Sequence, residues 1–167
     1  MYTTDHERIA SLAAKKNRLV EISLPRYLVL SALAGVYVGF GIALIFSVGG
    51  PPATVGSPIV KLVMGISFGI ALTLVIFAGS ELFTGNNMTG VIGGLSRSLT
   101  WAQVAQLNVW SWVGNLLGSL VLAWLVVQSG VLSKGPQSEL IGSVAAMKMS
   151  LPAWELFLRG LLCNWLV

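Results

Sequence analysis

Charge is scarce in this sequence of 167 residues. Only 10% of the residues are Asp, Glu, Lys or Arg, whereas a soluble globular domain carries about 25%. Cysteine and histidine occur once each, as Cys163 and His6, so a disulfide within the chain is excluded. The sequence contains no metal-ligand cluster, no phosphate-binding loop and no nucleophile–His–acid set. We therefore find no argument for an enzyme, a metal site or a cofactor.

Apolar residues make up 55% of the sequence, and they come in long blocks. The blocks cover residues 28–48, 59–78, 102–128 and 153–167, and about 20 apolar residues in a helix cross a bilayer. We therefore predict an all-α membrane protein with a transmembrane domain over residues 28–167 and the lipid bilayer as a partner. The fourth block stops at Val167 without a polar flank, so we expect that span to be incomplete.

The distribution of basic residues predicts the orientation of the spans. Residues 1–27 are polar, and their periodicity predicts a short amphipathic helix on the cytoplasmic side. The basic residues of this segment include Lys15, Lys16, Arg18 and Arg26. The loop at 49–58 has no Lys or Arg and fits the outside, whereas Arg97 marks a second cytoplasmic turn. The net charge of +4 is then explained by cytoplasmic flanks and requires no nucleic acid.

The second apolar block ends in a polar, glycine-containing stretch at residues 79–88. Such sequence at membrane depth is tolerated only where it is buried in protein or lines a water-filled cavity. The next cytoplasmic charge, Arg97, comes 19 residues after Ala78 (97 − 78 = 19). We predict a broken span, with a loop over 79–88 and a half-helix over 89–97. The alternative is a complete span followed by a polar cytoplasmic loop.

Two side chains of this loop, those of Glu81 and Thr84, are candidates for a structural or functional role. An unpaired carboxylate at the middle of a bilayer costs about 2.5–3.5 kcal/mol on insertion scales, so Glu81 should have partners, and backbone N–H groups freed by the break are candidates. We expect Glu81 to brace the loop. We expect the Thr84 hydroxyl to face a pore, where it would donate to an anion or orient a side chain from another segment.

Three further residues allow two readings each. Phe68 and Leu72 lie one helical turn apart, so they either pack in a core or form an apolar constriction that strips water from an ion. Lys148 stands before the fourth block. It either raises the local concentration of anions at a pore mouth or extends its charge to the membrane surface as an ordinary lysine does.

Two patterns recur along the chain. Glycines four residues apart predict closely packed helices, and the pairs are Gly35 with Gly39, Gly65 with Gly69, and Gly114 with Gly118. The triplet at 23–25, Ser-Leu-Pro, returns at 150–152 before the fourth block. Because three spans separate the two triplets, they predict an inverted repeat.

Residues 78–88, AGSELFTGNNM, closely resemble the signature loop of the formate/nitrite transporter family. Residues 157–167, FLRGLLCNWLV, resemble the second signature of that family, and residues 65–74 and 113–119 are also similar. The resemblance is greatest to the nitrite-transporter branch. It implies an aquaporin-like bundle of six spans, two of them broken, assembled as a homopentamer in the bacterial inner membrane. This chain would be the first half plus the start of the fourth span.

The resemblance also implies roles for single residues. Thr84 would face a central histidine of the second broken helix, which His6 cannot replace. Leu82 and Leu72 would form the cytoplasmic constriction and Phe68 the outer one. The complete set implied for the substrate pathway is Phe68, Leu72, Leu82, Thr84, Lys148 and Asn164.

The function implied is passage of a small monovalent anion, nitrite above others, which crosses after protonation and therefore in a pH-dependent way. Formate or hydrosulfide is the alternative within transport. A non-conducting membrane scaffold, or a pore for water or glycerol, is the alternative from another class. A scaffold would give no flux, and a pore for neutral solutes would give flux without pH dependence.

Overall fold

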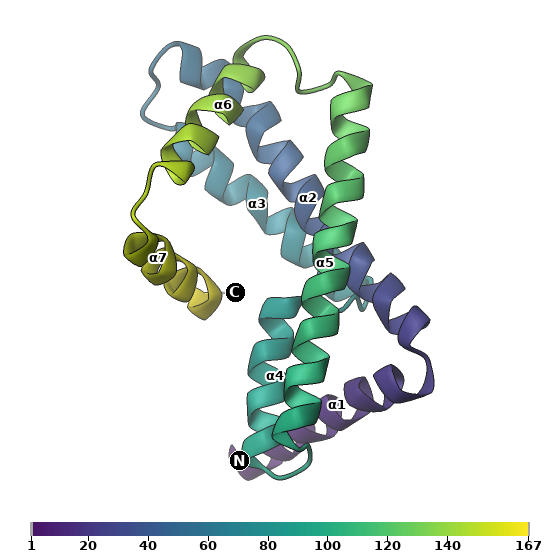
Figure 1. The fold of residues 1–167 in the computed structure, drawn as a ribbon. Helices are drawn as coiled ribbons and strands as arrows, with labels where there is room; N and C mark the ends of the chain where they lie inside the picture. The colour runs from purple at the N-terminus through teal and green to yellow at the C-terminus, as the bar shows by residue number, and fades with distance from the viewer. Residues whose placement is uncertain (1, 167) are drawn as a thin grey trace. The chain divides into compact units, whose positions relative to one another are not determined.

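The computed structural model describes residues 2–166, and these residues form helices and no strands. The prediction of an all-α protein is confirmed. The helices, coloured along the chain in Figure 1, are α1 (Tyr2–Ile22), α2 (Leu24–Thr54), α3 (Val60–Phe77), α4 (Phe83–Leu95), α5 (Trp101–Ser129), α6 (Pro136–Met149) and α7 (Ala153–Leu166). Three of them, α2, α3 and α5, are long and apolar enough to cross a membrane. Met1 and Val167, the outer ends of the predicted segments, lie outside the described residues.

Helix α2 is longer than the predicted span at 28–48, because it continues through Gly49, Gly50 and two prolines to Thr54. Glycine and proline disfavour helix, but tertiary packing overrides weak local preferences. A Cβ built on Gly49 would lie 2.8 Å from the Met64 side chain, and one on Gly50 would lie 2.8 Å from the backbone of Gln137. Only residues without a side chain let α2 approach both neighbours so closely.

The first of two compact units comprises Met1–Tyr37 and Leu74–Val121. It contains α1, the start of α2, α4 and most of α5, and α1 packs against α4 (Figure 1). Its buried apolar side chains form two clusters, one of Ala13, Leu99 and Val104, and one of Val20, Tyr27 and Leu107. The unit therefore has a core of its own, built from α1, α2, α5 and the turn that precedes α5.

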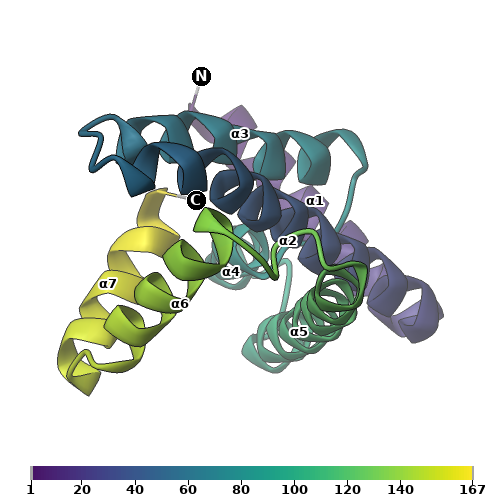
Figure 2. The same cartoon turned by 90° about the horizontal axis from the view of Figure 1, so that it is seen from above.

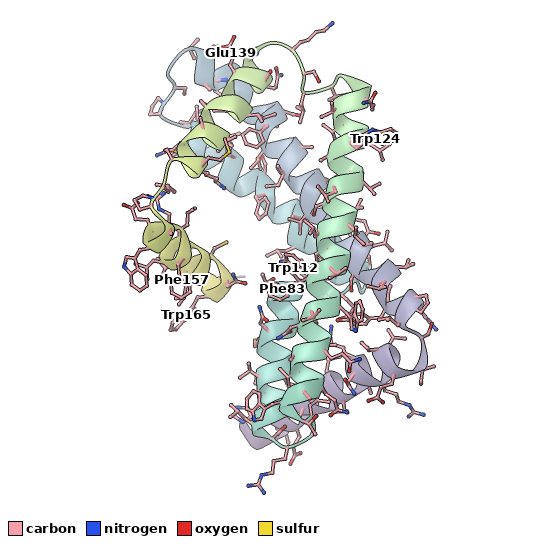
Figure 3. All side chains as sticks on the ribbon, viewed as in Figure 1. Phe83, Trp112, Trp124, Glu139, Phe157 and Trp165 are labelled. Carbon is pink, nitrogen blue, oxygen red and sulfur yellow. The ribbon has the colours of Figure 1, made fainter. Side chains whose placement is uncertain are left out.

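The second unit comprises Val38–Thr73 and Leu122–Val167. Here the later part of α2 runs beside α3, as Figure 2 shows, and a Cβ on Gly41 would lie 2.7 Å from the Cβ of Ala71. On α7 the rings of Trp154 and Phe157 stack with their centroids 5.6 Å apart. The described side chains of α7 are exposed, including the labelled Phe157 and Trp165 in Figure 3.

Helix α6 lies between the third and fourth apolar blocks, where the sequence predicts only an outer loop that contains Lys134 and Lys148. Its start has the usual signals, because Gly135 has φ +70° and Pro136 occupies the first turn, where a missing N–H costs nothing. Glu139 lies in the first turn (Figure 3) and Lys148 in the last. Both charges are on the side that the helix dipole favours. Lys148 therefore belongs to a helix end rather than to an open loop.

Large apolar side chains remain exposed along the candidate spans. Ile66, Ile76 and Phe77 of α3 are 73%, 73% and 89% exposed, and Trp112 and Trp124 of α5 (Figure 3) are also exposed. A soluble monomer rarely leaves so much apolar surface in water. The exposure agrees with the predicted membrane setting, where lipid covers apolar side chains that water would not.

Candidate functional site

The candidate site is the break between α3 and α4, and its first part is the end of α3. Gly79 has φ +62°, a conformation that glycine adopts without strain. The Ser80 N–H donates to the Val75 carbonyl at 3.1 Å, and the Gly79 N–H donates to the Ile76 carbonyl at 3.1 Å. These two bonds form a Schellman motif, which ends a helix by satisfying its last carbonyls. The predicted break therefore starts where the glycine places it.

The break is shorter than the loop expected over residues 79–88. Helix α4 begins at Phe83, six residues before the expected start at 89. The Glu81 N–H donates to the Leu30 carbonyl of α2 at 3.2 Å, and the Phe83 N–H donates to Asn115 Oδ1 of α5 at 2.9 Å. Backbone groups exposed by the break thus find partners inside the protein, as a low-dielectric setting requires.

The Glu81 carboxylate is buried, with only 7% of the residue exposed. Its partner is Lys16 of α1, whose Nζ lies 2.5 Å from Glu81 Oε2. The same Nζ donates to Asn86 Oδ1 of α4 at 3.0 Å. The expectation that Glu81 has partners is met, but by an ammonium group and not by the backbone N–H groups suggested from the sequence. Lys16 therefore belongs to the site.

Asn86 extends this cluster into the core of the unit. Its Nδ2 donates to the Tyr27 hydroxyl at 2.9 Å, and that hydroxyl donates to the Leu107 carbonyl at 3.3 Å. Tyr27 is fully buried and Asn86 is 1% exposed. The resulting chain of bonds links α1, α2, α4 and α5 around the break. A connected network of this kind is stabilising because each buried polar group has a partner.

Thr84 differs from its neighbours. Its hydroxyl oxygen is buried and has no hydrogen-bond partner among residues 2–166. Leu82, two residues earlier, is extended, with φ −86° and ψ 130°, and is half-buried. Buried polar atoms without partners are rare in native proteins. Two other buried atoms of this unit, Asn17 Oδ1 and Asn108 Oδ1, also lack a partner among the described residues. The Thr84 hydroxyl is the orphaned atom at the break, and it marks a point there where a further group would fit.

Phe68 and Leu72 lie on α3, in the second unit, and both are half-buried. The Phe68 ring is 3.4 Å from the position that a Cβ on Gly41 would occupy, so it packs against α2. This contact accords with the core-packing reading and leaves the constriction as a prediction. The structure places these two residues one turn apart on one helix, as the spacing predicts.

Lys148 and Asn164 also belong to the second unit, and both are exposed. The Asn164 Nδ2 donates to the Gly160 carbonyl of its own helix at 3.0 Å. The predicted pathway residues therefore fall into three described groups. Leu82 and Thr84 are at the break, Phe68 and Leu72 are on α3, and Lys148 and Asn164 are near α7.

The sequence analysis did not assign site roles to Lys16, Tyr27, Asn86 and Asn115. For Lys16 the sequence predicts only a cytoplasmic charge. The need for a counter-charge to Glu81 is a signal for Lys16, but the two residues are 65 positions apart in the sequence, so local patterns do not reveal the pair. Asn115 was seen only as part of a similar stretch, beside a glycine pair whose spacing predicted close packing.

Known proteins resemble this chain over most or all of its length. The family model described as Formate/nitrite transporter matches residues 3–167. The nitrite transporter NirC of Escherichia coli is 43% identical over 168 residues, which cover 100% of this chain and 61% of that protein. A probable formate transporter of Methanothermobacter thermautotrophicus is 39% identical over 161 residues, covering 86% of this chain and 59% of that protein.

A solved structure of an FNT family ion channel matches with a TM-score of 0.90 and 41% identity. The match covers 99% of this chain and 65% of that one. The chain thus spans less than two thirds of the length of these relatives. The break, its glycine and its orphaned threonine lie within the region that the family model matches. The chain belongs to the formate/nitrite transporter family.

Proposed function

We propose that this protein forms a transmembrane pathway for small monovalent anions, with nitrite as the favoured substrate. Relatives named as nitrite transporters support the choice of nitrite. A relative named as a probable formate transporter, at 39% identity, supports formate as the second candidate. The family membership supports transport rather than catalysis.

The observation that carries the proposal is the buried hydroxyl of Thr84. It has no partner in the described residues, although the backbone around it is bonded to α2 and α5. A scaffold whose broken helix only packs has no reason to keep an unsatisfied hydroxyl, because replacing it with a methyl group would cost nothing. We infer that Thr84 faces the pathway and bonds a substrate or a side chain of the second broken helix.

The other residues at the break and on α3 take supporting roles in this proposal. Leu82 and Leu72 form the cytoplasmic constriction and Phe68 the outer one. Between apolar walls the charged form of an anion is disfavoured, so its proton affinity rises. The anion then crosses as the neutral acid, which makes the flux pH-dependent. Glu81, held by Lys16, braces the break and stays outside the pathway.

Lys148 and Asn164 act nearer the pore mouth in this proposal. Lys148 raises the local concentration of anions by its positive charge. It is exposed in the last turn of α6, a position that leaves its charge accessible. Asn164 offers a polar group on the apolar fourth span, next to Cys163. Both assignments rest on the motif resemblance and on this exposure.

We further propose a homopentamer of aquaporin-like protomers in the bacterial inner membrane, with the N-terminus in the cytoplasm. The excess of Lys and Arg in residues 1–27 supports this orientation. The exposed apolar side chains of α3 and α5 support burial against lipid and neighbouring subunits. No nucleic acid and no cofactor has a place in this proposal.

The test is nitrite uptake into proteoliposomes that contain the full-length protein, measured over a range of external pH. We expect uptake to rise as the pH falls, and formate and hydrosulfide to compete with it. Protein-free liposomes give the background. Absence of flux would support the alternative of a non-conducting scaffold. Flux of water or glycerol without pH dependence would support a pore for neutral solutes.

A further inference from the structure

We propose that Asn115 is the positioning residue of the helix break, and that it sets where Leu82 and Thr84 stand in the pathway. This inference rests on the function proposed above, because the pathway role of Thr84 is part of that function. Asn115 lies on α5, and the contacts described for its side chain are with backbone atoms. It therefore acts through the break.

Both ends of the Asn115 side chain are used. Its Oδ1 accepts the Phe83 N–H at 2.9 Å, while its Nδ2 donates to the Ser31 carbonyl at 2.8 Å and to the Glu81 carbonyl at 2.9 Å. The orientation of the amide is fixed by these bonds. A flipped amide would set its NH₂ against the N–H and its oxygen against two carbonyls. One side chain thus ties α5 to α2 and to both sides of Leu82.

Close packing of α2 and α5 makes this reach possible. A Cβ on Gly118 or Gly35 would overlap the backbone of Ala32 or of Asn115 itself, so these positions admit only hydrogen. The two helices meet backbone to backbone at this point. Because the backbones are so close, the short side chain of Asn115 can bond both the Ser31 carbonyl of α2 and the backbone of the break. The close packing predicted for the glycines at 35 and 118 is therefore needed for the contacts of Asn115 at the break.

The two backbone groups of the break that Asn115 bonds are next to Leu82 and Thr84 in the chain. The Glu81 carbonyl precedes Leu82, and the Phe83 N–H precedes Thr84. Phe83 opens α4, and its N–H is one of those left without a partner in the helix. Loss of the amide would free this N–H and the Glu81 carbonyl together. The first turn of α4 would then shift, and with it the Thr84 hydroxyl.

The replacement Asn115→Asp separates positioning from mere stability. It keeps an acceptor for Phe83 but sets a carboxylate oxygen against the Ser31 and Glu81 carbonyls. Protonation of the new carboxyl restores one donor, so the variant should recover as the pH falls. The titratable groups on the elements around it are Glu81, paired with Lys16 of α1, and Arg26, Tyr27 and Tyr37 of α2, while residues 83–95 and 101–129 contain none.

The matched control is Ser119→Ala. Ser119 lies one turn further along α5, and its Oγ donates to the Gly35 carbonyl of α2 at 3.3 Å. This bond joins the same two helices as the Asn115 bond to Ser31, and it does not involve the break. A variant that merely loosens α2 from α5 is thus compared with one that also releases the break.

The first measurement is nitrite uptake by the full-length variants, divided by the wild-type uptake at each pH. For Asn115→Asp we expect a loss on the order of tenfold or more near neutral pH, with recovery toward the wild type about two pH units lower. Ser119→Ala should give a ratio that does not change with pH. A pH-independent ratio for an assembled Asn115→Asp variant would overturn the proposal.

The second measurement needs no transport. Thr84→Cys is introduced into a Cys163→Ser background, and its rate of modification by a small thiol reagent is compared with and without Asn115→Asp. We expect the rate to change severalfold with Asn115→Asp and to stay constant with Ser119→Ala. If the aspartate variant does not assemble, Asn115→Ser takes its place here. An unchanged rate would contradict positioning, whereas absent nitrite flux in the wild type would contradict only the proposed function.

Discussion

The region of the break, which comprises residues 78–86, and the region around α7 both place polar residues next to apolar helices, yet they are built differently. At the break, Glu81 and Asn86 are buried and bonded to Lys16 and Tyr27. Near α7, Lys148 and Asn164 are exposed, and Asn164 bonds only the backbone of its own helix among the interactions described. Polar residues of the first region hold the fold, whereas those of the second are left available.

Thr84 is the exception inside the first region. It stands among bonded groups, but its own hydroxyl has no partner in the described residues. The comparison therefore predicts two kinds of variant. Changes to the bonded groups should reduce stability, and changes to Thr84, Lys148 or Asn164 should reduce transport with little effect on stability. The variants below test this division, from the largest expected change in stability to the smallest.

Lys16→Met should have the largest effect. It removes the cation and leaves a carboxylate that is 7% exposed without its counter-charge, at a cost of about 3–5 kcal/mol. The measurement is thermal unfolding of the purified full-length protein in detergent. Lys15→Met, at an exposed neighbouring position, is the control. Equal unfolding temperatures for the two variants would show that the ion pair contributes nothing.

The double variant Lys16→Met with Glu81→Gln refines this result. It removes both charges, so it should recover most of the lost stability. Failure to recover would mean that Lys16 acts through Asn86 rather than through Glu81.

Gly118→Ala should come next. Its Cβ would overlap the Ala32 backbone, and overpacking of this kind costs about 1–3 kcal/mol. Gly142→Ala is the control, because a Cβ there meets nothing within 4 Å and alanine favours helix. Unfolding in detergent measures both. A harmless Gly118→Ala would argue against the close approach of α2 and α5.

Tyr27→Phe should cost about 1–3 kcal/mol, because it leaves the buried Asn86 Nδ2 without its acceptor. Tyr37→Phe, at a half-buried position of the same helix, serves as the comparison. The same unfolding assay applies. A larger loss for Tyr37 than for Tyr27 would contradict the network around the break.

Lys148→Met should change stability by no more than about 1 kcal/mol, the contribution expected from a cation at the end of a helix. Nitrite uptake at low substrate concentration and low ionic strength should fall severalfold, because the local anion concentration falls. Lys134→Met is the control, since Lys134 is exposed and lies outside α6. Equal uptake by the two variants would remove Lys148 from the pathway.

Whether the sequence predicts a feature of the break depends on whether that feature is set by neighbouring or by distant residues. The start of the break follows from local rules, because Gly79 ends α3 with a Schellman motif. Its end does not, because the N–H of Phe83 is capped by Asn115, 32 residues away. Local sequence therefore placed the second half-helix at 89–97, and the distant cap moves its start to Phe83. The partner of Glu81 was missed for the same reason.

Near α7 the sequence predicts the structure less completely for a different reason. Pro136 after Gly135 marks the start of α6, a local signal that the sequence does contain. The apolar block at 153–167 predicts a helix that carries Asn164, whereas the helical position of Lys148 follows only from α6. Their roles were assigned by resemblance, since neither residue has a neighbour in the described structure that reveals a function.

The most direct test of the central proposal is Thr84→Val, which replaces the hydroxyl with a methyl group of nearly the same shape. Unfolding temperature and pH-dependent nitrite flux are measured on the same full-length preparation. The hydroxyl lacks a partner in the described residues, so we predict an unchanged or higher unfolding temperature and a loss of flux on the order of tenfold or more. Unchanged flux with reduced stability would contradict the account, because Thr84 would then be one more bonded residue of the fold.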